Sequence, residues 1–435
     1  MHYISNTDQD KTQMLAAIGA AKFEDLIAQI PKRLQNFDWK MPPGISELEL
    51  TRELAEIGHQ NRHFFDHACY LGAGNYDHYI PAVVGQLAHR GEFITSYTPY
   101  QGEASQGTLQ SVYEYQSLIC ELTGMDFSNA SMYDGASSLA EACLLAIRSS
   151  GRKEIVLPRT LHPEYKKVVK TYLSCLDVKI SEVEDLQKSV TPESAAVVVQ
   201  QPNFFGNLED VHGISQAAHA AGALLIACVN PISLGILEPP GEVGADIAVG
   251  EGQPLGNPVS FGGPHFGFFT VKEALLRKIP GRITGITVDK VGRRSFVLTL
   301  QAREQHIRRE KATSNICTNH SLCALKAAIY LCLLGQEGIQ KISLLNLQNA
   351  HEAYDRLLRI KGVREFSSKP FFNEFVLWVD KNPESLRQRL REQKIIGPLD
   401  LQAFYPEMLG AYLFAVTENR TQSDLERLVK AIEAA

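Results

Sequence analysis

From about residue 130 onward, the chain alternates short runs of β-branched and apolar residues with segments of helical character. The runs predicted as strands are residues 154–157, 178–183, 195–200, 223–229, 246–249 and 266–271. Between the first two runs, apolar side chains recur at the spacing of one helix face, which predicts a crossover helix: Tyr165, Val168, Val169, Tyr172 and Leu173. Strands that alternate with helices build a mainly parallel sheet, so the sequence predicts an α/β fold.

The segments on either side of this region lack the alternation. A helical arm is predicted over residues 1–70, with helices at 25–34 and 46–59, the second begun by the capping-box pair Ser46 and Glu49. Towards the C-terminus the sequence predicts helices at 322–334, 342–358, 383–393 and 423–434 and strands at 372–379 and 412–416. We therefore expect three parts: the arm, a large α/β domain over residues 71–335, and a small α/β domain over residues 336–435, with the boundary near 335–338.

The composition is that of an ordinary globular protein, with 435 residues, 44% of them hydrophobic, and a formal net charge of −6. A mildly acidic chain has no overall electrostatic attraction to nucleic acid or to an anionic membrane surface. Residues 1–11 lack the basic and apolar regions of a secretory leader, and no apolar run is expected to reach membrane-spanning length. We expect no nucleic-acid partner, no membrane partner and a cytoplasmic location.

The cysteines and histidines do not predict a metal site. Eight cysteines occur singly within apolar segments, without a C-x-x-C pair, so buried free thiols are expected. His59, His63 and His67 recur every four residues on an expected helix that also carries Asp66. A metal-binding stripe is one interpretation, but a solvated helix face is favoured because no further cluster of ligands lies nearby.

Residues 128–150 contain a turn that leads into an apolar helix. Asp134 and Gly135 precede Ser137 and Ser138 at the start of that helix. Backbone N–H groups and hydroxyls gathered at a helix N-terminus suit a phosphate. An ordinary N-cap is the commoner meaning of this pattern.

Residues 95–107 form a polar and aromatic segment around Gly102, with Tyr97, Tyr100, Gln101, Glu103 and Gln106. A core strand does not tolerate this density of polar groups, and we favour a binding or interface loop over a plain solvated loop. Residues 301–315 include Arg308, Arg309 and Lys311 and, taken alone, indicate a solvated helix face.

Residues 244–267 hold seven glycines and three prolines but no lysine. Loops this rich in glycine usually let the backbone approach a ligand or a neighbouring chain closely.

Several long stretches, in this order, resemble the glycine cleavage P-protein family of pyridoxal-phosphate glycine decarboxylases: TPYQGEASQG, EYQSLICELTGMDFSNASMYDG, GADIAVGEGQPLGNPVSFGGPHFGFF, PGRITG and REQHIRREKATSNICT. The resemblance is to the N-terminal half of the P-protein and extends from about residue 10 to the C-terminus. In some bacteria the P-protein is two chains, and this chain resembles the first. The resemblance implies the pyridoxal-phosphate-dependent transferase fold type I, which is aspartate aminotransferase-like, with a mainly parallel large-domain sheet of the seven-stranded type.

The absent lysine gains meaning from this resemblance. A pyridoxal-phosphate enzyme needs a lysine amine to form an imine with the cofactor and a carboxylate beside the ring nitrogen. Matched against the second half of the family, Pro254 stands at the imine lysine and Ala227 at the carboxylate, and neither side chain can do that chemistry. Lys272 lies beyond the next apolar run, where it more plausibly begins a helix. The resemblance thus implies that a lysine-bearing second subunit holds most of the pyridoxal phosphate.

The resemblance also implies an activity and partners. Together the two subunits would decarboxylate glycine, release CO₂ and transfer the aminomethyl group to the lipoyl group of the H-protein, acting with the T-protein and L-protein, in an α2β2 assembly. We expect this chain to pair through its arm and large domain.

We expect five residues of this chain to reach a glycine site at the subunit interface, with Gly102 as the hinge of their loop: Tyr97, Tyr100, Gln101, Glu103 and Gln106. Ser137 and Ser138 are only weak candidates for cofactor binding. Arg308, Arg309 and Lys311 would pair across the subunit boundary or attract an acidic carrier. Two alternatives stay open: a self-sufficient enzyme that uses another lysine such as Lys272, and a catalytically inactive regulatory or scaffold homologue.

Overall fold

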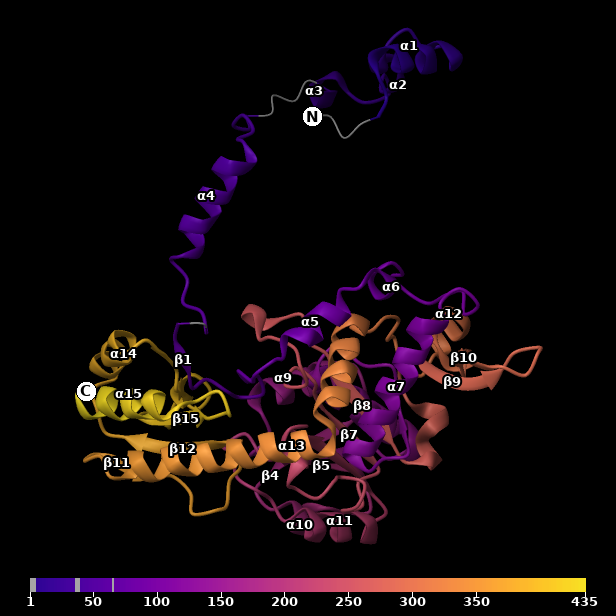
Figure 1. The fold of residues 1–435 in the computed structure, drawn as a ribbon. Helices are drawn as coiled ribbons and strands as arrows, with labels where there is room; N and C mark the ends of the chain where they lie inside the picture. The colour runs from indigo at the N-terminus through magenta and orange to yellow at the C-terminus, as the bar shows by residue number, and fades with distance from the viewer. Residues whose placement is uncertain (1–4, 36–39, 65) are drawn as a thin grey trace. The chain divides into compact units, whose positions relative to one another are not determined.

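The structure is a computed structural model that describes residues 5–35, 40–64 and 66–435 (Figure 1). The chain divides into two compact units, residues 1–62 and residues 63–435. The expected boundary of the arm at residue 70 stays a prediction. The further division between residues 335 and 336 stays a prediction.

The first unit is a series of helices: α1 Asp8–Ala17, α2 Phe23–Leu26, α3 Lys32–Gln35 and α4 Glu47–Gly58. The expectation of one helix over residues 25–34 is wrong. The chain turns between α2 and α3 because Pro31 has no N–H to donate and its ring clashes with the preceding turn. The capping box of α4 is confirmed, since Glu49 N donates to Ser46 Oγ at 3.3 Å and Ser46 N donates to the Glu49 carboxylate at 2.9 Å.

The expected stripe of histidines does not form, because α4 ends at Gly58. His59, His63 and His67 therefore do not share a helix face. Nδ1 of His63 and Nδ1 of His67 instead lie 3.1 Å and 2.7 Å from the Asp66 carboxylate. Over the residues that the structure describes, no three His, Cys, Asp or Glu side chains gather as a metal site would require.

The core of the second unit is a seven-stranded sheet with the strand order β2-β8-β7-β6-β5-β3-β4. These strands are Phe127–Ser128, Gly267–Val271, Ile247–Glu251, Leu224–Val229, Ser194–Gln201, Glu154–Pro158 and Lys179–Val183, in the order of the sheet. The five strands from β7 to β4 run parallel, whereas β8 pairs antiparallel with both β7 and β2. The predicted parallel α/β sheet is confirmed.

Helices cover both faces of this sheet, because alternate residues of each buried strand point to opposite sides. Leu225 and Ala227 of β6 pack with α7 Gln106–Thr123, α11 Val211–Ala220 and α13 Ser321–Leu358. Ile226 and Cys228 pack on the other face with α8 Gly135–Ser150 and α9 Pro163–Leu173. The crossover helix predicted from the apolar spacing is α9.

A second, antiparallel sheet has the order β11-β12-β15-β14. Its strands are Val363–Glu365, Glu374–Val379, Ala411–Ala415 and Leu399–Asp400, and α14 Pro383–Glu392 and α15 Gln422–Glu433 share one core with β12 and β15. Figure 1 shows α13 passing from the large sheet towards this smaller one.

The two helices expected on either side of residue 335 are both present within α13, and they meet at a kink at Gly335, which has φ 60° and ψ −173°. By length and composition, α13 is apolar enough to cross a membrane, contrary to the expectation from the sequence. Part of its apolar surface lies in the protein core, with Ala327, Tyr330 and Leu331 beside the large sheet and Ala353 beside the small sheet, whereas Leu333, Leu344 and Leu345 are exposed. This is the environment of a core helix.

The sequence analysis missed a long hairpin formed by β9 Ile283–Val288 and β10 Arg294–Thr299. In Figure 1 it projects beside α12 Gln305–Arg308, and both strands pack against α7. The remaining elements are short: β1 Ala68–Cys69, α5 Ala82–Ala88, α6 Gly91–Ile94, α10 Leu186–Ser189 and β13 Ile395–Ile396.

All eight cysteines are free thiols, but they are not all buried as expected. Cys175, Cys317 and Cys332 are exposed. The apolar segments that contain these three cysteines turn one side to solvent, and the apolar neighbours of a cysteine in the sequence do not show which side it lies on.

Candidate functional site

The loop that precedes α7 presents two tyrosines to solvent. Tyr97 is 81% exposed and Tyr100 is 74% exposed, values far from those of tyrosines in a core. Gln101 and Glu103 are exposed as well. Side chains of this size on an exposed loop are available to a ligand or to another chain.

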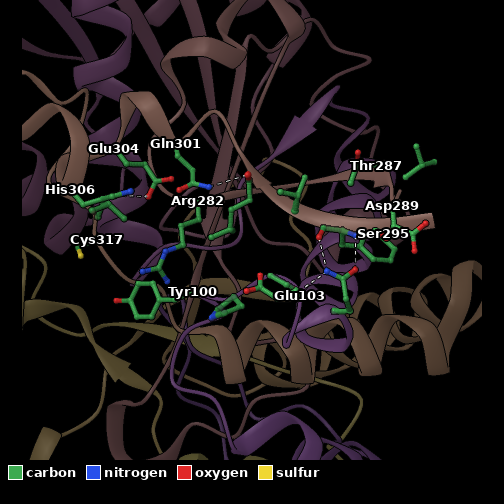
Figure 2. A pocket seen from close by; sticks show the side chains of 18 of the residues that line it. Tyr100, Glu103, Arg282, Thr287, Asp289, Ser295, Gln301, Glu304, His306 and Cys317 are labelled. Carbon is green, nitrogen blue, oxygen red and sulfur yellow. Dashed lines mark hydrogen bonds and ion pairs between the residues drawn. The ribbon is translucent and has the colours of Figure 1, made fainter. Parts of the chain in front are cut away.

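A cavity of about 780 Å³ lies between this loop, the β9–β10 hairpin and residues 301–317 (Figure 2). Of the five loop residues that the sequence singled out, Tyr100, Glu103 and Gln106 line it. Tyr97 lines a smaller neighbouring cavity of about 100 Å³, and Gln101 lines neither. The larger volume is in the range of small-molecule sites.

Gln106 joins the loop to the hairpin. Its Oε1 accepts from Phe296 N at 2.8 Å, and its Nε2 donates to Phe296 O at 2.9 Å and to Gly102 O at 2.6 Å. These bonds use both N–H donors of the amide, so Gln106 positions the cavity wall and has no free donor for a ligand.

Gly102 shows no conformational need for glycine. It is not among the residues with positive φ, and an added Cβ would make an ordinary contact of 3.6 Å with Leu109. Its role as a hinge stays a prediction.

Arg282 is the residue that the sequence analysis overlooked in this cavity. It follows Gly281, and its backbone carbonyl accepts from Ala130 N at 2.8 Å. Its guanidinium carbon lies 6.0 Å from the centre of the Tyr100 ring, and Figure 2 shows the two groups side by side. This is the reach of a cation–π contact.

Arg282 lines both the large cavity and the smaller one that contains Tyr97. Among the described residues, no side-chain hydrogen bond or ion pair joins its guanidinium. The other arginine in the wall, Arg293, is paired with Asp289 at 2.9 Å, and His306 lies 3.9 Å from the Glu304 carboxylate. Arg282 is therefore the unpaired cation of this wall.

The basic segment over residues 301–315 is only partly the solvated helix that the sequence indicated. Arg308, Arg309 and Lys311 are exposed. Arg303 is buried and donates to the carbonyls of Ile279 and Gly281, at 2.7 Å for the second. Arg303 thus fixes the backbone next to Arg282, and burial lowers its pKa.

A second, much smaller cavity of about 40 Å³ contains Pro254. It lies where the carboxyl ends of β5, β6 and β7 meet, the edge at which parallel α/β sheets bind ligands. Its wall comprises Gly74, Tyr76, His162, Tyr165, Gln200, Pro202, Cys228, Val229, Asn230, Pro231, Glu251, Pro254 and Glu374. No lysine is among these residues, all of which belong to the described part of the chain.

Ala227 does not share this cavity. It points to the opposite face of β6 and lines a separate cavity with Val199 and Val211, while its neighbour Cys228 lines the one that contains Pro254. The structure therefore does not place Pro254 and Ala227 in one cavity. Strand β6 nevertheless carries no carboxylate on either face.

Three of the first N–H groups of α8, those of Gly135, Ser137 and Ser138, find acceptors within the chain. Asp134 accepts from Ser137 N at 2.7 Å, and the hydroxyls of Ser137 and Ser138 donate to Asp134 O at 3.2 Å and 2.6 Å. Gly135 N donates to the Glu251 carboxylate at 3.0 Å. Both serines act as structural residues in this arrangement, and a carboxylate occupies the place that would suit a phosphate.

Glycines over residues 244–267 serve internal packing. An added Cβ at Gly252 would overlap the Phe266 ring, and one at Gly256, which has φ +77°, would lie 2.7 Å from Tyr330. Lys272 precedes the short helix Glu273–Lys278, as expected, and its Nζ donates to Gly124 O at 3.4 Å. It is not in the wall of the Pro254 cavity.

Glu374 is a buried carboxyl at the edge of the small cavity. It accepts from Ala73 N at 2.6 Å and from the Tyr76 hydroxyl at 2.7 Å. Burial raises its pKa from 4.5 to about 7, and the two hydrogen bonds partly offset that rise.

The raised pKa of Glu374 predicts a pH dependence of stability. The native carboxyl keeps its proton to about pH 7, whereas the unfolded one releases it near 4.5, so the free energy of unfolding falls as pH rises between these values. Glu374→Gln should reduce this slope, as measured by urea unfolding at several pH values across the window. Glu184→Gln, at a side chain 72% exposed, is the control. An unchanged slope in Glu374→Gln would contradict the assignment.

The family model described as glycine cleavage system P-protein matches residues 1–432. The chain belongs to the glycine cleavage system P-protein family. The resemblance found in the sequence is confirmed.

Individual relatives agree over their whole lengths. The chain is 49% identical over 439 residues to a probable glycine dehydrogenase (decarboxylating) subunit 1 of Desulfitobacterium hafniense, covering 99% of this chain and 98% of the relative. It is also 49% identical over 442 residues to a protein of the same description from Carboxydothermus hydrogenoformans, covering 99% of each.

Solved structures confirm the fold. An inhibitor-bound glycine decarboxylase (P-protein) is 46% identical, with a TM-score of 0.92, over 100% of this chain and 99% of that one. A sphingosine-1-phosphate lyase of Burkholderia pseudomallei is 15% identical, with a TM-score of 0.64, over 93% of each chain, and shows the fold alone. The predicted fold type I is thereby confirmed.

Proposed function

We propose that this chain is the subunit without the cofactor lysine in a two-chain, pyridoxal-phosphate-dependent glycine decarboxylase of the glycine cleavage system. The observation that most strongly supports this proposal is the full-length match to proteins described as subunit 1 of glycine dehydrogenase (decarboxylating). The presence of Pro254, and of no lysine, in the wall of the chain's own crevice supports the division of labour. In this proposal a second subunit holds the pyridoxal phosphate.

The reaction is glycine decarboxylation with transfer of the aminomethyl group to the lipoyl group of the H-protein, the activity of glycine dehydrogenase (aminomethyl-transferring). Bound pyridoxal phosphate supplies an electron sink for the pair of electrons left when CO₂ departs. This chain's own crevice does not fit that group, because Glu251 occupies the N-terminus of α8 and the cavity is only about 40 Å³. Its contribution lies elsewhere, in the larger cavity and the exposed loop.

In that larger cavity, Tyr100 and Glu103 are the loop side chains offered to a shared glycine site, and Gln106 holds the loop against Phe296. Tyr97, in the smaller cavity beside it, and the exposed Gln101 extend this surface along the same loop. Arg282 adds an unpaired positive charge beneath the tyrosines. A carboxylate is the natural partner of a guanidinium, and the carboxylate of glycine fits this requirement. A site desolvated by a second chain would strengthen each of these contacts.

The arm is proposed to pair with another chain. Helix α4 carries Leu50, Leu54 and Ile57 at helical spacing, exposed by 45%, 56% and 52%. Within the arm, no described side chain is buried. Apolar area of this kind is normally covered in an assembly, and we propose an α2β2 complex in the cytoplasm.

The other glycine cleavage proteins are proposed as functional partners: the lipoyl-bearing H-protein, and the T-protein and L-protein that complete the system. Arg308, Arg309 and Lys311 are exposed and could meet an acidic carrier or the second subunit. Charges at the rim of an interface chiefly raise the rate of association.

The test is to express each chain alone and both together, and to measure exchange of labelled bicarbonate into the carboxyl group of glycine in the presence of H-protein. We expect exchange only in the pair. Full exchange by this chain alone would establish the self-sufficient alternative, and no exchange by a folded pair would favour the inactive homologue.

A further inference from the structure

The crevice at the carboxyl ends of the parallel strands has the position of a ligand site and almost none of its volume. Residues at the ends of β5, β6 and β7 converge there with His162 after β3 and with the N-terminus of α8. Small-molecule sites occupy roughly 300–1,000 Å³. The space here is about 40 Å³, room for only a few water molecules, since one water needs about 10–15 Å³ on this measure.

Glu251 fills the anion-binding end of the crevice. One carboxylate oxygen accepts from Gly135 N at 3.0 Å and the other from Gln253 N at 3.1 Å. The first donor belongs to the first turn of α8, where the free N–H groups and the helix dipole favour a negative group. Burial raises the pKa of Glu251 to about 8, so near pH 7 the side chain is a neutral carboxyl. It still accepts these two N–H bonds from within the fold, in the place where a phosphate would accept them from outside.

Tyr165 fills the space beside His162. The two rings are stacked, with centroids 4.9 Å apart and planes inclined by 25°. The Tyr165 hydroxyl lies over Gly135, where an added Cβ would overlap it and would also come within 2.8 Å of Glu251 N. The aromatic side chain and the end of β7 therefore pack directly on the start of α8.

A third group of contacts holds this packing in place. Gln253 Oε1 accepts from Tyr76 N at 2.9 Å, and Gln253 Nε2 donates to Tyr76 O at 3.0 Å. Tyr76 in turn donates its hydroxyl to Glu374 of the small sheet at 2.7 Å. The loop after β7 is thus tied to the segment before α5 and to β12.

We propose that Glu251 and Tyr165 act as internal substitutes for a phosphate ester and an aromatic ring, so that the crevice of this chain has become a structural centre that excludes such ligands. Introducing a lysine at Pro254 would then not restore binding, because the space is filled and the N–H groups of Gly135 and Ser137 are already used. The inference rests on the proposed assignment of this crevice as the vestige of a cofactor site. It is tested on this chain alone, without glycine turnover.

The probe is pyridoxine 5′-phosphate, which has the ring and the phosphate but no aldehyde and therefore cannot react with surface lysines. Equilibrium dialysis should show no saturable binding to the unaltered chain or to Pro254→Lys. The double variant Glu251→Ala/Tyr165→Ala should bind the probe saturably, at least about tenfold more tightly than the lower limit of Kd set by the other two proteins, and inorganic phosphate should compete. Glu141→Ala/Tyr172→Ala, which changes the same residue types on α8 and α9 at positions outside the crevice wall, should not bind.

Two results would overturn the proposal: saturable binding by the unaltered chain, or no binding by a double variant whose circular dichroism shows it folded. If the double variant does not fold, amide hydrogen exchange of the unaltered chain decides. Added pyridoxine 5′-phosphate should leave exchange at residues 134–138 unchanged, and increased protection there would contradict the inference. These results concern the crevice of this chain alone. The proposed activity of the two chains together is tested separately, by glycine–bicarbonate exchange.

Discussion

Replacing Arg282 by glutamine is expected to lower kcat/KM for glycine in the two-chain enzyme by about 100-fold, as the loss of a preorganised charge typically does. Arg282 is the unpaired cation of the large cavity and lies 6.0 Å from the centre of the Tyr100 ring. The measurement is glycine–bicarbonate exchange over a range of glycine concentrations. Arg282→Lys keeps the charge but loses the planar fork, so its kcat/KM should lie between those of the unaltered enzyme and Arg282→Gln.

Arg293→Gln is the matched control, because it removes the same charge from the same cavity wall. Arg293 is 80% exposed at its side chain and already paired with Asp289, and such pairs contribute little. We expect a change within about threefold. Equal losses in the two variants would show that the cavity responds to overall charge and not to Arg282.

Gly206→Ala is expected to destabilise the protein by about 4 kcal/mol or more, the range of severe steric change. Gly206 has φ 85°, and an added Cβ would overlap the backbone carbonyl oxygen of Glu374. That contact joins the loop after β5 to β12 next to the filled crevice. Urea unfolding followed by circular dichroism measures the effect through the midpoint of the transition.

Gly292→Ala separates the steric overlap from the cost of a positive φ. Gly292 has φ 80° in the turn of the β9–β10 hairpin, with open space where a Cβ would lie. It should cost about 1–2 kcal/mol, the ordinary penalty of left-handed backbone for an L-residue. If Gly206→Ala lowered the free energy of unfolding no more than Gly292→Ala does, Gly206 would not approach the Glu374 backbone as closely as it does in the structure.

The large sheet could be predicted because its strands are buried on both faces and read as apolar runs between helices. The β9–β10 hairpin was missed although Asp289 and Gly292 mark a turn between two alternating segments, a local signal that was present. The arm was predicted less well, since Pro31 divides what looked like one helix. A single proline there ended the helix that the residues around it favour.

The site was predictable only where its residues lie together in the sequence. Tyr97, Tyr100 and Glu103 could be found from the composition of one loop. Arg282 meets Tyr100 across 182 positions and Glu251 meets Gly135 across 116, so both depend on the tertiary fold. No local pattern distinguishes a glutamate that will end at a helix N-terminus from one that will face solvent.

The central claim is that the nucleophilic amine comes from another chain. Its most direct test is to treat the active two-chain enzyme with borohydride in the presence of pyridoxal phosphate, and then to map the modified lysine by mass spectrometry of each chain. We predict one phosphopyridoxyl group per second subunit and none in stoichiometric amount on this chain. A stoichiometric label on a lysine of this chain, such as Lys272, would contradict the account.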